Sequence, residues 1–137
     1  MKRFFSIIVL MLFCLSSVNA MSWTEARTYI TKITLQEGFG KNKITYNYYS
    51  YYQKDNESLI TYARINCFNN NEKCHITYYK PVFSLSKHDL DCVTYHELGH
   101  QDEWKIRLEG DLSEEYANNY MQLKDSSCKL RYSEVGS

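Results

Sequence analysis

The sequence is poor in the residues that break or loosen a fold, with one Pro and five Gly among 137 residues. This scarcity argues against a disordered or low-complexity chain. Positive charge is not in excess either, because 16 Lys and Arg are balanced by 16 Asp and Glu, and there is no basic run. The chain therefore lacks the electrostatic basis of non-specific nucleic-acid binding, and we expect no nucleic-acid partner.

What the sequence does contain is an ordinary hydrophobic content of 44% and an unusual 13 Tyr. A chain of this length favours a single domain. Tyrosine fits half-buried strands better than the interior of a helical bundle, so the composition indicates substantial β-structure.

The N-terminus has the pattern of a secretory signal peptide. Residues 1–3 form a short positive start, residues 4–15 are almost entirely apolar, and residues 18–20 suit cleavage after Ala20. The apolar stretch is too short to span a bilayer comfortably. We therefore expect an exported protein, periplasmic or secreted, with no stable membrane anchor and one domain over residues 21–137.

Four cysteines remain after such cleavage, and an even number in a small exported domain predicts two disulfides. Cys67 and Cys74 flank a turn-rich segment that suits a hairpin tip, so we favour this pair, with Cys92 then bonded to Cys128. Two other pairings stay open. Cys92 also precedes a histidine by four residues, so thiolate ligation of a metal is an alternative to its disulfide.

The hydropathy pattern predicts an α+β fold that starts with a helix and a small sheet. Ser22 and Glu25 match a capping box, and the helix runs to about Leu35. From residue 43 to 83 the period becomes two, and Ile-Thr-Tyr recurs three times at 16-residue intervals, at residues 44–46, 60–62 and 76–78. Turn residues separate the three β-rich segments, which predicts a three-stranded antiparallel meander. Its tyrosines either line a binding face or, as we favour, simply make good strands.

The last third of the chain predicts two helices. The segment from Ser86 to Asp89 suits an N-terminal cap, and the helix that follows continues at least through His100. Residues 109–111 interrupt it, and residues 113–124 predict a second helix with one apolar face.

The first of these helices contains His-Glu-Leu-Gly-His at residues 96–100. Residues four apart share a helix face, so His96 and His100 can bind one metal ion, for which zinc is well suited. Glu97 lies about 100° around the helix, where its carboxylate can act as general base on a water at the metal. Gly99 allows a neighbouring element to approach closely. The ordinary alternative is two surface histidines and a solvated Glu.

A hydrolytic zinc site takes three protein ligands and keeps one position open. No histidine follows His100, so a third imidazole would have to come from His75 or His88. Otherwise a downstream carboxylate completes the site, from Glu103, Glu109, Asp111, Glu114 or Glu115. Glu114 opens the last predicted helix, where it could face the first.

The histidine motif, followed by Glu-Glu-Tyr-Ala-Asn at residues 114–118, resembles the gluzincin metallopeptidases, in particular the ImmA/IrrE family and the compact minigluzincins. These have a helix, a small antiparallel sheet, the histidine helix and a helix that supplies a Glu. The resemblance covers residues 86–124 by motif and the rest by element order. It implies Zn²⁺ as cofactor, with His96, His100 and Glu114 as its ligands and Glu97 as the general base. It also implies that Asn118 orients one of the ligands.

The spacing sets a geometric condition on this site. Thirteen residues separate His100 from Glu114, and a first helix that ran on to residue 108 would leave Glu114 about 10 Å below His100. We therefore expect the helix to end near Asp102 or Glu103. Asp102 itself is a departure, because zinc peptidases usually have an apolar residue there.

These features predict a small exported zinc metallopeptidase that acts on peptide or protein substrates. A sheet edge, expected at residues 74–83, would bind an extended substrate by strand addition. Tyr95, Tyr116 and Tyr120 are the candidate donors to the oxyanion. Two alternatives are a catalytically silent, zincin-like metal-binding partner protein and a disulfide-stapled, Tyr-rich binding module in which the motif is accidental.

Overall fold

The computed structural model of the chain describes residues 21–47, 52–54, 57–59, 62–68, 73–107 and 112–129. The predicted signal peptide lies outside these ranges. Within them, no helix combines the length and hydrophobicity needed to cross a membrane.

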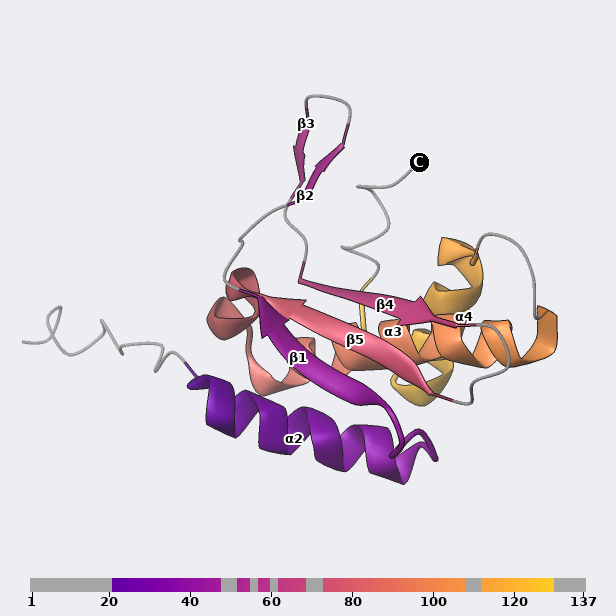
Figure 1. Cartoon of the computed structure of the whole chain (residues 1–137), viewed down its shortest axis with the longest axis horizontal. Coiled ribbons are helices and arrows are strands. Elements are labelled where there is room, and N and C mark those ends of the chain that lie inside the picture. Colours follow the sequence, from indigo (N-terminus) through magenta and orange to yellow (C-terminus); the bar gives the residue numbers. More distant parts are fainter. Residues whose placement is uncertain are drawn as a thin grey trace, which may run out of the picture.

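The architecture is α+β, as the sequence predicts, with a small three-stranded mixed sheet and a separate two-stranded hairpin (Figure 1). In chain order the elements are α2 (Trp23–Gln36), β1 (Lys43–Asn47), β2 (Tyr52–Lys54), β3 (Glu57–Leu59), β4 (Ala63–Cys67), β5 (Cys74–Tyr79), the 3-10 helix η1 (Lys80–Ser84), α3 (Lys87–Arg107) and α4 (Glu114–Lys124).

Both predicted caps are present at the starts of their helices. In α2 the N–H of Glu25 donates to the Ser22 hydroxyl at 3.3 Å, and the N–H of Ser22 donates to the Glu25 carboxylate at 2.9 Å. In α3 the N–H of Asp89 donates to the Ser86 hydroxyl at 3.0 Å. These bonds satisfy backbone donors that have no partner inside the helix.

The sheet is mixed, so the prediction of an antiparallel meander is wrong. The strand order is β1-β5-β4, with β5 parallel to β1 and antiparallel to β4. The central strand is therefore the last one in the sequence, and β4, predicted to lie in the middle, forms an edge. The expectation that residues 74–83 form an edge strand is therefore also wrong, because β5 is the central strand.

The burial of the strands accounts for this order. Every second residue of β5 is buried and the others are half-buried, whereas β4 exposes Arg64 and Asn66. The central position buries both faces of a strand, so it suits β5, whose side chains are the more buried of the two. The β2–β3 hairpin occupies the middle of the predicted β-region, so the chain returns to the sheet only at Ala63 (Figure 1).

The repeated Ile-Thr-Tyr tripeptide pairs with itself across the parallel strands. Its first copy in β1 faces its third copy in β5, residue against identical residue, from Ile44 and Ile76 to Tyr46 and Tyr78. Tyr46 stacks on Trp23 of α2 with ring centroids 5.2 Å apart, and Tyr78 is fully buried. Tyr78 is therefore a core residue, whereas Tyr46 is half-buried beside α2; residues 60 and 61 of the middle copy lie outside the described ranges.

The hydrophobic core lies where α2 and α3 cover one face of the sheet. Ile76 and Tyr78 of β5 share a buried cluster with Ile30 of α2 and with Leu90 and Leu98 of α3. The Tyr78 hydroxyl lies 3.0 Å from the hydroxyl of Thr94, which supplies a hydrogen-bond partner inside the core. This packing holds α3 with one side against the sheet.

The two disulfides are those favoured from the sequence. Cys67 is bonded to Cys74 at the end of the β4–β5 ladder, where the two residues are paired across the strands. Cys92 of α3 is bonded to Cys128, which follows α4. The alternative of Cys92 as a ligand beside His96 and His100 is not what the structure shows.

Helix α4 packs against the other side of α3, and Gly99 lies at the closest approach. A Cβ atom at Gly99 would lie 2.8 Å from the Cα and 3.0 Å from the carbonyl oxygen of Ala117. The predicted role of Gly99, to admit a neighbouring element, is confirmed. The expected early end of α3 is wrong, because the helix continues to Arg107.

The geometric condition failed because it placed Glu114 at the turn, beyond the end of α3. Six residues separate Arg107 from Glu114, and an extended segment of that length reaches about 20 Å. Glu114 therefore need not lie beyond the end of α3. The buried Glu103 carboxylate accepts a hydrogen bond from the N–H of Ser113 at 2.6 Å, which holds the start of α4 one turn beyond His100.

We expect Gly99→Ala to lower the free energy of unfolding by up to about 2 kcal/mol in urea titrations. Alanine favours a helix over glycine by about 1 kcal/mol, but overpacking against backbone atoms costs about 1–3 kcal/mol. Gly40→Ala is the matched control, because its closest contact, at 2.8 Å, is the end of the flexible, exposed Leu35 side chain. Equal stability of the two variants would contradict this account of the helix contact.

Candidate metal centre

The two motif histidines and the favoured glutamate come together between α3 and α4. The Nε2 atom of His96 lies 3.1 Å from one carboxylate oxygen of Glu114, and the Nε2 atom of His100 lies 3.3 Å from the other. The candidate ligand atoms of the three residues lie within 4.8 Å of one another. The sequence therefore identified a cluster that tertiary structure assembles from two helices.

Each element presents its side chain for a local reason. His96 and His100 are one turn apart on α3 and only 6% and 7% exposed, because α4 covers that side of the helix. Glu114 is in the first turn of α4, where the Ser113 side chain caps the helix by accepting from the N–H of Tyr116. A carboxylate in that turn is favoured by the helix dipole.

The two histidines and Glu114 are electrostatically complementary. The pKa of Glu114 is held well below its usual range, chiefly by hydrogen bonds from His100 and His96. Burial alone would lower the pKa of His96, but the hydrogen bond to Glu114 and the nearby Glu97 charge outweigh it, and the pKa is raised. The lowered pKa of Glu114 and the raised pKa of His96 thus reflect the same contact between the two side chains.

Glu97 is buried beside the histidines, 6% exposed. Burial raises its pKa, and the charges of His96 and His100 offset part of that rise. A hydrogen bond with the backbone of Ile65 in β4 also acts to lower the pKa, which indicates that the carboxylate meets the sheet edge. A raised pKa suits a group that must take up a proton and release it again.

The residues present fit a zinc ion. Two imidazole nitrogens and one carboxylate are the donor set of many catalytic zinc sites. The Glu114 side chain is 51% exposed, so the cluster has a solvent-facing side. The residues can bind a metal ion as they stand, with α3 supplying two ligands and α4 the third.

Asn118 is buried one turn after Glu114 and contributes to the environment of His96. Its Oδ1 atom and the Nδ1 atom of His96 are both buried without an assigned hydrogen-bond partner among the described residues. A polar contact from Asn118 nevertheless helps to raise the pKa of His96. This placement agrees with the role expected from the sequence, in which Asn118 orients a ligand ring.

The other ligand candidates lie elsewhere or outside the described residues. His75 contacts Thr45 across the β1–β5 pair at 2.6 Å, and His88 contacts Ser127 and Asp125. Glu103 binds Ser113 and Arg107. Glu115 is exposed on α4 and is not in the cluster. Glu109 and Asp111 fall on residues that the structure does not describe.

Two of the three candidate oxyanion tyrosines donate to other groups. The Tyr116 hydroxyl donates to Asp102 at 2.8 Å, and the Tyr120 hydroxyl donates to Glu37 at 3.1 Å. Tyr95 packs beside the second, smaller core cluster around the Cys92 disulfide. The Tyr116 bond also explains the unexpected Asp102, which joins α3 to α4.

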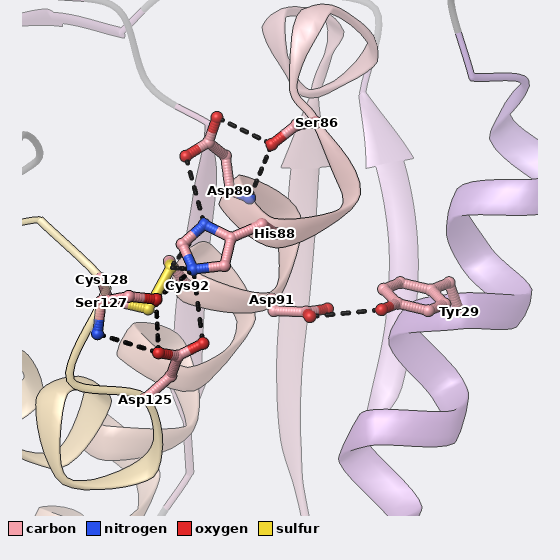
Figure 2. A network of polar contacts seen from close by, with 9 residues as sticks. All are labelled: Tyr29, Ser86, His88, Asp89, Asp91, Cys92, Asp125, Ser127 and Cys128. Atoms are coloured by element: carbon pink, nitrogen blue, oxygen red, sulfur yellow. Dashed lines mark hydrogen bonds and ion pairs between the residues drawn. A yellow bond between two sulfur atoms is a disulfide. The ribbon is translucent and has the colours of Figure 1, made fainter.

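Sequence reasoning missed a polar network at the opposite end of α3 (Figure 2). There His88 contacts Asp125 and Ser127, which follow α4, next to the Cys92–Cys128 disulfide. His88 and Cys92 are spaced by four residues, like the motif histidines. That repeated spacing was the signal available in the sequence.

Comparisons with known proteins found no counterpart. No protein-family model matches the chain, and neither the curated proteins nor the solved structures include a match.

We expect Glu114→Gln to remove most of the stabilisation that zinc gives the folded chain, because it weakens the ligand that joins the two helices. Zinc at 100 times its dissociation constant should stabilise the wild-type chain by about 2.7 kcal/mol. Thermal unfolding with and without zinc, and after addition of a chelator, measures this difference. Glu115→Gln is the neighbouring control and should retain it. Equal zinc responses in both variants would exclude Glu114 as a ligand.

We expect Asn118→Ala to lower zinc affinity by about 10–100-fold, the usual effect of losing a group that orients a metal-ligating histidine. Competition with a chromophoric chelator gives the affinity. Asn119→Ala removes the exposed neighbour on the same helix and should change nothing. An unchanged affinity in the Asn118 variant would assign that residue to packing alone.

Proposed function

We propose that the chain is a zinc-dependent metallopeptidase. The observation that supports this most is the meeting of three donor groups from two helices: the Nε2 atoms of His96 and His100 lie 3.1 and 3.3 Å from the Glu114 carboxylate. Glu97 lies buried beside them on α3, which supports its assignment as the base. An accidental motif gives no reason for a third ligand to arrive from α4.

In this proposal, three residues bind the zinc and a fourth transfers the proton. His96, His100 and Glu114 would hold the zinc, which when bound lowers the pKa of water and polarises a carbonyl group. Glu97 would accept a proton from the attacking water and deliver it to the leaving nitrogen. Its burial favours the first step, because the raised pKa makes the carboxylate a stronger base.

The substrate is proposed to be an extended peptide that lies along β4. This strand is an edge of the sheet, and its Ile65 backbone is close enough to contribute to the pKa of Glu97. A peptide paired with the outer side of β4 would pass the candidate centre. Main-chain pairing is nearly independent of sequence, so we expect broad selectivity for unfolded segments.

The proposed setting is outside the cytosol. Two disulfides are typical of proteins in oxidising compartments. The export signal that the sequence predicts at residues 1–20 would deliver the chain to such a compartment, periplasmic or extracellular.

We expect Glu97→Gln to abolish peptidase activity while leaving zinc bound. Loss of a general base costs about 10²–10⁴-fold in rate, and the amide keeps the shape of the carboxylate. The assay follows release of fluorescence from labelled, unfolded casein, and metal analysis gives the zinc content. Glu115→Gln is the control that should keep full activity.

The outcome separates the proposal from its alternatives. Zinc binding without hydrolysis by the wild-type chain would identify a silent metal-binding protein. A purified chain that binds no zinc would leave the binding-module alternative. Hydrolysis that survives in the Glu97 variant would assign the base to another residue.

A further inference from the structure

Helix α3 carries two pairs of potential metal ligands, each spaced by four residues. His96 and His100 form the pair described above, and His88 and Cys92 form the other. Eight residues along a helix correspond to about 12 Å and a rotation of about 80°. The second pair therefore lies at a separate place, near the start of the helix.

The chain after α4 brings two further potential ligands, Asp125 and Cys128, to this place. Cys128 is bonded to Cys92, and the candidate ligand atoms of His88, Cys92 and Cys128 lie within 4.8 Å of one another. The Nε2 atom of His88 lies 3.3 Å from Asp125 Oδ2. Figure 2 shows the His88 ring next to the disulfide, with the Asp125 carboxylate below both.

The Asp125 carboxylate is held in an orientation that leaves one oxygen for a ligand. Its Oδ1 atom accepts hydrogen bonds from the N–H and the hydroxyl of Ser127, at 2.9 and 2.6 Å. Its Oδ2 atom faces His88. Both cysteines are 2% exposed, whereas His88 and Asp125 are partly open to water, so a cation has a route to the buried sulfurs.

We propose that reduction of the Cys92–Cys128 disulfide creates a second zinc site, with His88, Cys92, Cys128 and Asp125 as its ligands. A dithiol reductant donates two electrons and two protons to the disulfide, becomes a disulfide itself, and leaves two thiols. Zinc binding then releases both thiol protons. This site is independent of the proposed peptidase centre and of its activity.

The measured distances suit a tetrahedral ion. With zinc–nitrogen and zinc–oxygen bonds of about 2.0–2.2 Å, a ligand nitrogen and oxygen lie about 3.3 Å apart, as His88 and Asp125 do here. Cys92 Sγ lies 3.9 and 4.0 Å from the His88 ring nitrogens, close to the roughly 3.6 Å expected of sulfur and nitrogen ligands. The two sulfurs must separate to about 3.8 Å.

The consequence is that the start of α3 and the segment after α4 stay connected in either redox state. The disulfide holds the segment after α4 on the start of α3 when the chain is oxidised. Zinc would hold the same two segments in the reduced chain, which includes a chain that has not yet formed its disulfides. The other end of the α3–α4 pair is held by the Gly99 contact and by Glu103.

Cobalt(II) tests the proposal, because only thiolate ligands give it intense near-ultraviolet charge-transfer absorption, and the His96–His100–Glu114 site has none. The purified Cys14→Ser/Cys67→Ser/Cys74→Ser chain keeps the second site and removes the other thiols. Reduced with a phosphine, it should bind cobalt with this absorption, and excess zinc should abolish the band. The oxidised chain should show no band.

Two variants of the same chain test the ligands. His88→Ala should lower cobalt affinity at least about tenfold. Loss of a residue that only orients a metal ligand already costs about 10–100-fold, and loss of a ligand should cost no less. Asp89→Asn is the control, since Asp89 lies beside the other ring nitrogen at 3.9 Å without being a proposed ligand. Equal affinities in these variants, or no charge-transfer band in the reduced chain, would overturn the proposal.

Alkylation of the wild-type chain keeps the test decisive if the serine variants do not fold. In the reduced protein, zinc should protect Cys92 and Cys128 from iodoacetamide while Cys67 and Cys74 react, as mapped by mass spectrometry. Among the described residues, the Cys67–Cys74 pair belongs to no three-residue ligand group. Equal labelling of all four cysteines in the presence of zinc would refute the site.

Discussion

The close approach of α3 and α4 at Gly99 is the constraint on which the candidate centre depends. Ala117 lies so near the missing side chain of Gly99 that no larger residue fits without movement of backbone. Metal–ligand distances tolerate only about 0.2 Å of change, and Glu114 is one turn before Ala117. The separation of the two helices at a glycine therefore determines whether a carboxylate reaches two imidazoles.

Electrostatics reinforces this geometry. Buried histidines and carboxylates are costly when alone, and here each compensates another. Glu114 stays ionised because two imidazoles donate to it, and His96 keeps a raised pKa because two carboxylates lie near. The folded chain thus holds these donor atoms within 4.8 Å of one another.

Local signals in the sequence predicted most of what is local in the structure. The caps at Ser22 and Ser86, the helix face shared by His96 and His100, and the Cys67–Cys74 hairpin all depend on residues a few positions apart. Gly99 and Glu114 could be identified because helix geometry and zinc chemistry restrict the choices. The family assignment itself remains an expectation from the motif.

Long-range choices could not be read from the same signals. Strand propensity identifies β-segments but not their neighbours, so nothing local specified that β1 would join β5 in parallel. The end of α3 at Arg107 could not be predicted from the spacing of His100 and Glu114, because that spacing does not specify how the two helices pack. The contact of His88 with Asp125 likewise requires two segments that only the tertiary fold brings together.

The pairing of Cys67 with Cys74 has a consequence for the exposed border of the sheet. Cross-strand partners joined by a covalent bond cannot slide past one another, so the alternation along β4 cannot shift to the opposite face. Closing so short a loop also removes about 2.5 kcal/mol of chain entropy from the unfolded ensemble in the entropic description. The strand's outer row of amides and carbonyls is thereby kept as a rigid template, although only one neighbour supports it.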